Sequence, residues 1–472
     1  MKLPKEVAIY GAGFLGKWMF YHLKFLGYKV KFFIDEHKEE KIFLGCKVYK
    51  IDSVSDKKIP ICVCVNKGVK SIKEKLVKLG FYSVYTFEEL AGFIKEDFKN
   101  LNKFEIPEIE CEEVILDHAL GGGSNLYTEE YTKHKKNTVI IRIFPINFLE
   151  IPLFLCIYDT KEENFFPGFD RFCEFLKLSA PKVLTVNHLI TYPLPGIIKF
   201  LKNLKKQRNF FLVFNVHDYF SICPSYNLLN NASEFCNIPE NLDMCKNCFK
   251  QNFFIKEILN FLPKTSISKW RKVFKEFFEL VDEVRCFSYA SKDILLRVYP
   301  FLKNKIVVKP HQVNWVRPVK AIQNSEKLNV GIIGNINIAK GAEVVLNLHN
   351  YLESNKTKGV KLHIFGRLIT DEPLKEDEWL KIYGPYKKEE LPNIIKNHEI
   401  NVIFIPSIWP ETFCYTAEEG MKMGLPVAVF DLGAPAERVK NYEKGIVLDY
   451  SKRFDSKYVI KMLEKCKNLW IS

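Results

Sequence analysis

Short apolar runs alternate with amphipathic segments at the start of the chain. Strand candidates are Val7–Tyr10, Lys29–Ile34 and Ile59–Val65, and helix candidates are Lys17–Leu26 and Ser71–Leu79. Strands that alternate with helices form a parallel sheet with helices on its faces. We therefore predict a small α/β domain over residues 1–95, followed over 96–112 by a charged, non-periodic segment that is typical of a linker.

The same alternation recurs twice further along the chain. Strand candidates in the second stretch are Val114–Leu116, Val139–Phe144, Val183–Val186, Phe211–Val216 and Glu283–Phe287. Strand candidates in the third stretch are Val330–Gly334, Lys361–Phe365, Lys381–Tyr383, Asn401–Ile405 and Pro426–Phe430. The pattern predicts an α/β protein with further domains over 113–315 and 316–450, and a C-terminal helix over 451–472 that packs back on an earlier domain.

The composition supports several buried cores and limits the kinds of partner. Of 472 residues, 47% are apolar and 14% aromatic, which excludes general disorder. Lys and Arg number 70 against 56 Asp and Glu, and the excess is spread through every segment. Nucleic-acid-binding proteins more often concentrate their cations on one helix or tail, so we expect no nucleic-acid partner. Codon bias remains one explanation of the excess, and attraction to phosphate-bearing ligands or an anionic membrane remains the other.

The cysteines and the N-terminus indicate a reducing compartment. The chain has 13 Cys, an odd number, and Met1–Tyr10 lacks the basic, apolar and small-residue order of a signal peptide. We therefore expect a cytoplasmic, reduced protein. The longest apolar stretch, Val139–Tyr158, contains charged residues and two prolines, which favours paired strands over a membrane-spanning helix.

Four cysteines are spaced C-x12-C-x8-C-x2-C, and they are Cys223, Cys236, Cys245 and Cys248. Four thiols that end in a C-x2-C pair can hold a structural zinc ion. The first two spacings differ from those of a standard zinc knuckle. A structural zinc site and free, partly buried thiols therefore both remain open.

A glycine-rich turn joins the first strand to the first helix. It contains Gly11, Gly13 and Gly16, and Asp35 closes the next strand. In this context glycines let the backbone approach a pyrophosphate, and the acid can accept from a ribose hydroxyl. With Phe33-Ile34-Asp35 and Gly45, the segment resembles the small nucleotide-sugar-binding domains fused to bacterial sugar-modifying enzymes. The alternative is an empty module whose glycines serve only tight packing.

The segment Ile403–Val439 carries two glutamates, Glu411 and Glu419, around a turn that enters a helix near Thr416. Backbone N–H groups at the start of that helix can face a diphosphate, Glu419 can bind ribose hydroxyls, and Glu411 can face a sugar. The residues that would present these N–H groups include Phe413, Tyr415 and Thr416. The predicted ligand is a nucleotide sugar.

The pair of glutamates resembles the Glu-x7-Glu signature of retaining glycosyltransferases of family 4, and the following Gly424-Leu425-Pro426 and the Gly433-Ala434 turn strengthen the likeness. The resemblance implies the GT-B architecture, in which two Rossmann-like domains face a cleft, with the donor mainly on 316–450 and the acceptor mainly on 113–315. It also implies a saccharide or lipid-linked acceptor, cell-surface polysaccharide synthesis at the inner face of the cytoplasmic membrane, and no cofactor beyond the donor.

A second loop, Gly334 to Gly341, resembles the family's Gly-Arg-x5-Lys-Gly loop. Lys340 stands where the family's diphosphate-binding lysine would be. Asn335 stands where an arginine is usual, and this departure leaves one phosphate contact in doubt. We expect Arg367, which follows another strand, to supply that charge.

The second stretch of the chain carries the residues that we expect on the acceptor side. Gly121, Gly122 and Gly123 follow its first strand, and ligands of open α/β sheets bind at the carboxyl ends of strands. His217 begins a His-Asp-Tyr run that resembles one common in family 4 enzymes, which implies a contact with the donor sugar or a proton shuttle. His188 ends a neighbouring strand candidate and is a second candidate of this kind.

Two alternatives to a transferase remain open. One is a catalytically inactive nucleotide-sugar-binding scaffold, and the other is an NAD-dependent sugar oxidoreductase that uses the N-terminal domain. The aromatic and basic segment Phe249–Phe278 also has two interpretations: a surface helix that rests on a membrane, or the core face of a buried helix.

Overall fold

The computed structural model describes residues 4–38, 41–65, 68–90, 92–93, 106, 108–144, 152–159, 162–259, 265–319, 327–370, 374 and 376–469. The chain divides into two compact units. Unit 1 comprises Met1–Leu184, Thr191–Pro193 and Lys206–Phe210, and unit 2 comprises Thr185–Ile190, Leu194–Lys205 and Phe211–Ser472. The domain boundaries expected from the sequence stay a prediction, and most of the linker expected over 96–112 lies outside the described residues.

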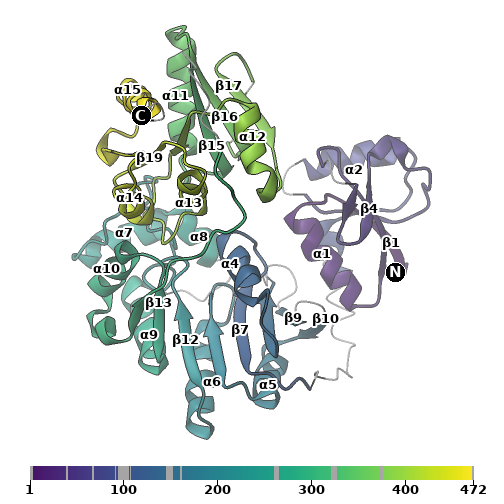
Figure 1. Ribbon diagram of the computed structural model, residues 1–472. Coiled ribbons are helices and arrows are strands. Elements are labelled where there is room, and N and C mark those ends of the chain that lie inside the picture. Colours follow the sequence, from purple (N-terminus) through teal and green to yellow (C-terminus); the bar gives the residue numbers. More distant parts are fainter. Residues whose placement is uncertain are drawn as a thin grey trace. The chain divides into compact units, whose positions relative to one another are not determined.

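The first sheet has the strand order β3-β4-β2-β1-β5-β6 (Figure 1). Its elements are β1 (Glu6–Tyr10), α1 (Phe14–Phe25), β2 (Lys29–Ile34), β3 (Ile42–Phe43), β4 (Cys46–Tyr49), β5 (Ile61–Val63), α2 (Val69–Lys78) and β6 (Val84–Thr86). Alternate residues of β1 enter two different cores, because successive side chains of a strand point to opposite faces. Val7 and Ile9 pack with α1, and Ala8 and Tyr10 pack on the face that Leu76 of α2 covers.

The second sheet has the strand order β10-β9-β8-β7-β11-β12-β13-β14. Its strands are β7 (Glu113–His118), β8 (Thr138–Ile143), β9 (Leu153–Tyr158), β10 (Glu162–Pro167), β11 (Val183–Val186), β12 (Phe211–Asn215), β13 (Glu283–Cys286) and β14 (Ile306–Val308). The associated helices are α4 (Gly123–Thr132), α5 (Phe169–Ser179), α6 (Leu194–Gln207), α7 (Leu242–Gln251), α8 (Phe253–Leu259), α9 (Ile267–Leu280) and α10 (Tyr289–Val298). Strands β8 and β9 pair antiparallel, which confirms paired strands in Val139–Tyr158; residues 145–151 between them lie outside the described ranges.

The third sheet has the order β17-β16-β15-β18-β19-β20, with parallel pairing throughout. Its elements are β15 (Leu328–Ile336), α11 (Ala342–Ser354), β16 (Val360–Leu368), β17 (Leu380–Gly384), α12 (Leu391–Asn397), β18 (Val402–Ile405), α13 (Tyr415–Lys422), β19 (Val427–Phe430), α14 (Gly433–Val439), β20 (Gly445–Leu448) and α15 (Ser456–Asn468). Helices α11 and α15 pack on one face, and α12, α13 and α14 on the other (Figure 1). The predicted α/β class with Rossmann-like parallel sheets is confirmed.

The aromatic and basic segment lies partly in α9. Trp270, Phe274, Phe277 and Phe278 of this helix are buried, so its apolar stripe faces the protein core. Residues 260–264 of the same segment lie outside the described ranges. Among the helices that the structure describes, none has both the length and the apolar character that crossing a bilayer requires.

Candidate functional site

Glu411 lies in the segment between β18 and α13, beyond the carboxyl end of a buried strand. Its backbone is fixed by α14, because Ala434 N donates to Glu411 O at 2.9 Å. Gly433 has φ +63°, and a Cβ there would come within 2.6 Å of the Pro410 backbone. The Gly433-Ala434 turn therefore permits the close approach that holds Glu411 in place.

The Glu411 carboxylate is buried and paired with one cation. Lys340 Nζ lies 2.5 Å from Glu411 Oε2, and the Glu411 side chain is only 2% exposed. Burial alone would lower the pKa of Lys340, but the Glu411 carboxylate and Cys414 together outweigh burial and the pKa is raised. The other carboxylate oxygen, Oε1, is buried and has no hydrogen-bond partner within the described part of the chain. A buried acceptor without a partner is costly, so this oxygen is suited to a ligand that donates.

The loop that carries Lys340 is tied to the segment that precedes Glu411. Ile408 N donates to Ala339 O at 3.0 Å. Gly341 has φ +86°, and a Cβ there would come within 2.0 Å of Pro406 O, so only glycine fits between this loop and the strand end. Backbone contacts of the Lys340 loop and of the Glu411 segment thus keep the ammonium of Lys340 beside the carboxylate of Glu411.

Glu419 lies on α13, which begins at Tyr415, close to the helix start expected near Thr416. Its side chain is buried, and Trp315 Nε1 donates to Glu419 Oε1 at 2.7 Å. Burial raises the pKa of Glu419 to about 7, although the Trp315 hydrogen bond and the charge of Lys388 both act to lower it. A carboxyl with this pKa changes charge near neutral pH.

Two predicted histidines lie close to the start of α13. The rings of His188 and His217 are 5.8 Å apart and nearly parallel, and Thr412 Oγ1 donates to His217 O at 2.8 Å. His188 Nδ1 lies 3.4 Å from Asp218 Oδ2. Thr412 follows Glu411 directly, so the structure brings His217 into the neighbourhood of the two glutamates.

Sequence reasoning missed His311 and Trp315, which lie on the segment that follows β14. The His311 ring lies 4.4 Å from the Phe413 ring and 5.7 Å from the His217 ring, and burial lowers the pKa of His311 to about 3. Trp315 lies 5.7 Å from the Tyr415 ring. Both residues stand in an irregular segment with no periodicity or glycine signal, so no sequence pattern could have selected them.

Arg367 lies beside Asn335, and its role as a substitute for the missing arginine stays a prediction. The two residues are register partners on the parallel strands β15 and β16, and both are exposed. Gly334 and Gly366 are the preceding pair, and a Cβ on Gly366 would come within 2.1 Å of Gly334 O. Paired residues of neighbouring strands project to the same face, so Arg367 carries its charge next to the Asn335 position.

The triple glycine lies in unit 1, at the start of α4. Gly121 and Gly122 have positive φ, and a Cβ on either would meet nothing within 4 Å. The neighbouring Asp117 is fully buried and accepts hydrogen bonds from His118 N, Ser124 Oγ, Asn125 Nδ2 and Thr128 Oγ1. This network fixes the strand-to-helix turn and leaves the Cα positions of Gly121 and Gly122 facing open space.

The N-terminal turn places its three glycines in different surroundings. A Cβ on Gly16 would come within 1.8 Å of Gly11 O, whereas one on Gly13 would meet nothing within 4 Å. Asp35 Oδ2 accepts from Ala12 N at 2.8 Å, and Oδ1 accepts from the N–H groups of His37 and Lys38, each at 2.9 Å. Asp35 therefore organises the backbone of the turn. It also borders a cavity lined by Lys38, Lys41, Lys47 and Lys50.

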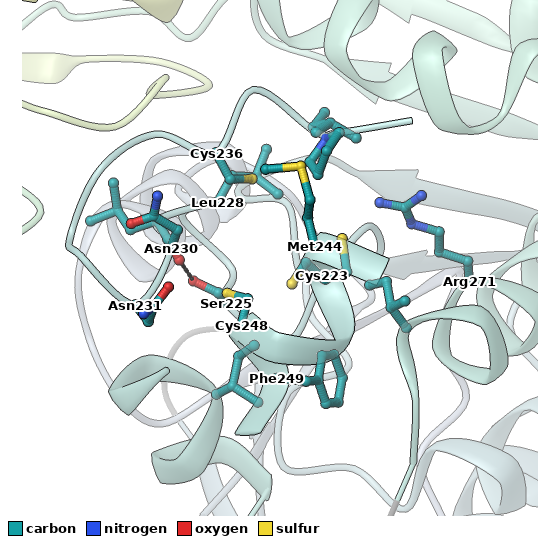
Figure 2. Close-up of a pocket in the computed structure, with 16 residues that line it drawn as sticks. Cys223, Ser225, Leu228, Asn230, Asn231, Cys236, Met244, Cys248, Phe249 and Arg271 are labelled. Atoms are coloured by element: carbon teal, nitrogen blue, oxygen red, sulfur yellow. Dashed lines mark hydrogen bonds between the residues drawn. The ribbon is translucent and has the colours of Figure 1, made fainter. Parts of the chain in front are cut away.

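The four spaced cysteines line one cavity in unit 2. Figure 2 shows Cys223, Cys236 and Cys248 around it, with Arg271 from α9 at its edge. Burial raises the pKa of Cys223, and the other three cysteines raise it further. In the part of the chain that the structure describes, no group of three or more His, Cys, Asp or Glu side chains is placed to hold a metal ion, and all four thiols are free. Structural zinc at these cysteines stays a prediction.

A comparison with protein families gives the class of the region that holds Glu411, Glu419 and Lys340. Residues 317–468 match the family model of glycosyl transferases group 1. This match supports a glycosyltransferase. No curated relative matches the chain.

Several solved structures are similar to the chain. A sucrose-phosphate synthase from Thermosynechococcus elongatus has 14% identity and a TM-score of 0.49, and covers 76% of this chain and 92% of its own. A glycosyltransferase from Rickettsia africae has 16% identity and a TM-score of 0.44, and the match covers 76% of this chain and 93% of that one. TarM of S. aureus has 11% identity and a TM-score of 0.42, and the match covers 98% of this chain and 93% of that one.

Proposed function

We propose that the protein is a retaining glycosyltransferase that moves a sugar from a nucleotide-sugar donor to a saccharide or lipid-linked acceptor. The observation that carries this proposal is the buried Glu411 carboxylate, whose Oε2 is held by Lys340 and whose Oε1 has no hydrogen-bond partner among the described residues. Sugar hydroxyls are donors of the kind that this oxygen lacks. The family match over residues 317–468 supports the same function.

In this proposal the donor binds around Glu411, Lys340 and α13. The diphosphate accepts from Lys340, from Arg367 and from backbone N–H groups at the start of α13, where the helix dipole favours negative charge. Glu419 binds the ribose hydroxyls and Glu411 binds the sugar. Lys340 Nζ lies 2.5 Å from Glu411 Oε2, so in this proposal one ammonium serves both the carboxylate that binds the sugar and the diphosphate.

The proposed reaction breaks the bond between the sugar C1 and the diphosphate oxygen and forms a bond between C1 and an acceptor hydroxyl oxygen on the same face. The nucleoside diphosphate leaves with the bonding electron pair, and the acceptor proton passes to the leaving group or to water. Positive charge develops on the ring and negative charge on the leaving oxygen. Fixed cations and N–H groups at the diphosphate therefore accelerate the step, and His217 contacts the sugar.

We propose the loop Gly121–Gly123 and His188 as acceptor-side residues, because two glycines of the loop face open space and His188 stacks on His217. The acceptor and its use in cell-surface polysaccharide synthesis remain proposals, as does a contact with the membrane. The transfer needs no cofactor beyond the donor in this mechanism.

The test is release of UDP or GDP from a panel of nucleotide sugars by the wild-type protein and by Glu411→Gln. We expect the substitution to slow nucleotide release by about 100-fold or more, because it removes the charge that faces the developing oxocarbenium ion. The exposed Glu343, on α11 of the same sheet, provides the control Glu343→Gln, which we expect to retain activity.

Two results would contradict the proposal. Release that survives Glu411→Gln would remove Glu411 from the site, and NADH oxidation without nucleotide release would favour the oxidoreductase alternative. The NMR coupling constant of the anomeric proton in the product then distinguishes retention from inversion.

A further inference from the structure

The segment from Lys309 to Val319, which follows β14, is attached to α13 at three points. The hydrogen bonds are Trp315 Nε1 to Glu419 Oε1, Lys422 Nζ to Val313 O, and Val319 N to Met423 O. Two of these bonds hold the backbone of the segment, and the third joins two side chains. The helix that carries Glu419 is therefore anchored on the segment that carries Trp315.

We propose that Trp315 is a positioning residue for the nucleotide: its indole N–H holds the Glu419 carboxylate in the orientation and the ionised state that accept the ribose hydroxyls. This inference rests on the proposed function, in which Glu419 is the ribose ligand. The supporting geometry is a 2.7 Å hydrogen bond to a carboxylate whose residue is only 5% exposed. Hydrogen bonds to buried charged groups are among the stronger ones in proteins.

The ring of Trp315 is itself in contact with two other side chains. Lys388 Nζ lies over it, 4.5 Å from the ring centroid, and the Tyr415 ring lies 5.7 Å away. A ring packed in this way keeps its N–H direction fixed, so the carboxylate that it binds has one preferred orientation. The contact to Tyr415 also links the indole to the first residue of α13.

The charged and titratable groups around Glu419 come from several elements. Lys388 lowers the pKa of Glu419, as does the Trp315 hydrogen bond, while burial raises it to about 7. Burial raises the pKa of Tyr386, and the Glu419 carboxylate raises it further. On α13 itself Glu418 is engaged by Arg438 of α14. Loss of the indole N–H removes one of the two influences that keep Glu419 ionised near neutral pH.

The experiment measures binding of UDP, GDP and ADP to the full-length protein between pH 5.5 and 9, about 1.5 units below and 2 units above the pKa of Glu419. Wild-type affinity for the diphosphate that binds best should rise with pH, with a midpoint near pH 7, and level off about one unit higher, because the ribose hydroxyls need an ionised acceptor. In Trp315→Phe we expect this midpoint to move up by roughly one unit, which weakens binding about fivefold at pH 7 and by less than about twofold at pH 9.

The matched control is Trp379→Phe. Trp379 Nε1 donates to Thr357 O at 2.7 Å in the same domain, but it does not contact Glu419, so its loss should leave the midpoint unchanged. Trp315→Leu, which has no side-chain hydrogen-bond donor, should shift the midpoint as Trp315→Phe does. In turnover, both Trp315 variants should raise KM for the donor and leave kcat within about twofold.

The possible failures are distinguishable. If Glu419→Gln leaves nucleotide affinity and its pH dependence unchanged, Glu419 is not the ribose ligand and the donor site of the proposed function is wrong. If Glu419→Gln weakens binding while Trp315→Phe and Trp315→Leu keep the wild-type midpoint, only the role of Trp315 is overturned. Should Trp315→Phe fail to fold, the pH profile of Trp315→Leu decides.

Discussion

Two strand-to-helix turns of this protein contain glycines in similar places but differ in what their acidic residue does. In the first sheet, the Asp35 carboxylate accepts hydrogen bonds from three nearby backbone N–H groups, and Gly16 packs closely against the backbone of Gly11. In the third sheet, Gly341 also closes against a neighbouring backbone, but Glu411 keeps one buried oxygen without a hydrogen-bond partner among the described residues.

The comparison shows that a glycine pattern identifies a tight turn and does not by itself identify a binding site. Close packing explains Gly16 and Gly341 equally well, since a Cβ at either would meet a carbonyl oxygen at 1.8 or 2.0 Å. The two turns differ in whether the carboxylate oxygens of the acidic side chain already have hydrogen-bond partners. A carboxylate that already satisfies the local backbone has little capacity for a ligand, whereas a buried oxygen without a partner is a cost that a ligand can relieve.

The largest effect is expected from a pair of substitutions, Gly16→Ala and Gly13→Ala. The pair tests whether close packing explains the glycine at the first turn. We expect Gly16→Ala to destabilise the first sheet and its helices by about 3 kcal/mol, because its Cβ would lie 1.8 Å from Gly11 O. Gly13→Ala should cost less than about 1 kcal/mol, because its Cβ would meet nothing within 4 Å and its φ of −100° suits alanine.

Hydrogen exchange of β1 and α1 amides in the full-length protein measures both substitutions. This probe reports the first sheet itself, which a global melt of the whole chain would not isolate. Equal protection in Gly16→Ala and Gly13→Ala would show that packing does not explain Gly16. The turn would then have to be reconsidered as a site that needs a bare backbone.

Much of the fold could be predicted because buried parallel strands are apolar and helices between them are amphipathic. The predicted strand Val330–Gly334 lies within β15, but β15 continues to Ile336 and β16 to Leu368. The extension contains the exposed pair Asn335 and Arg367, which match in register. A strand prediction that relies on runs of apolar residues misses a strand end that is polar and that only its partner strand holds in place.

The candidate site could be predicted only where its residues share one motif. Glu411 and Lys340 stand in loops and Glu419 stands on α13, all in motifs that are recognisable along the chain, and the structure places Lys340 Nζ 2.5 Å from Glu411 Oε2. His311 and Trp315 reach the same region from an irregular segment, through contacts that only the folded chain creates. Their roles depend on tertiary packing, which leaves no mark on residue spacing.

A smaller effect is expected from Asp35→Asn. The substitution replaces a charged acceptor of three N–H groups by an amide with one acceptor oxygen, so the first sheet and its helices should lose about 1–2 kcal/mol of stability. Nucleotide release from sugar donors should stay within about twofold of wild type, because Asp35 serves its own turn. Weaker binding of UDP or GDP in calorimetry, with unchanged hydrogen exchange, would instead make Asp35 a ligand residue and remove the contrast with Glu411.

The smallest expected effect is that of Arg367→Gln, which tests the turn at Gly334 in the third sheet. Arg367 is exposed and lies beside Asn335, so its proposed contact with the diphosphate is partly screened by water. Arg367→Gln should weaken nucleoside diphosphate binding about fivefold at low salt, with a smaller difference from wild type at high salt, and should leave stability unchanged. Lys361→Gln, at the other end of β16, removes a charge from the same strand and should leave binding unchanged. If calorimetry shows equal losses for both substitutions, the effect of Arg367 comes from overall charge, and the turn at Gly334 supplies no specific phosphate contact.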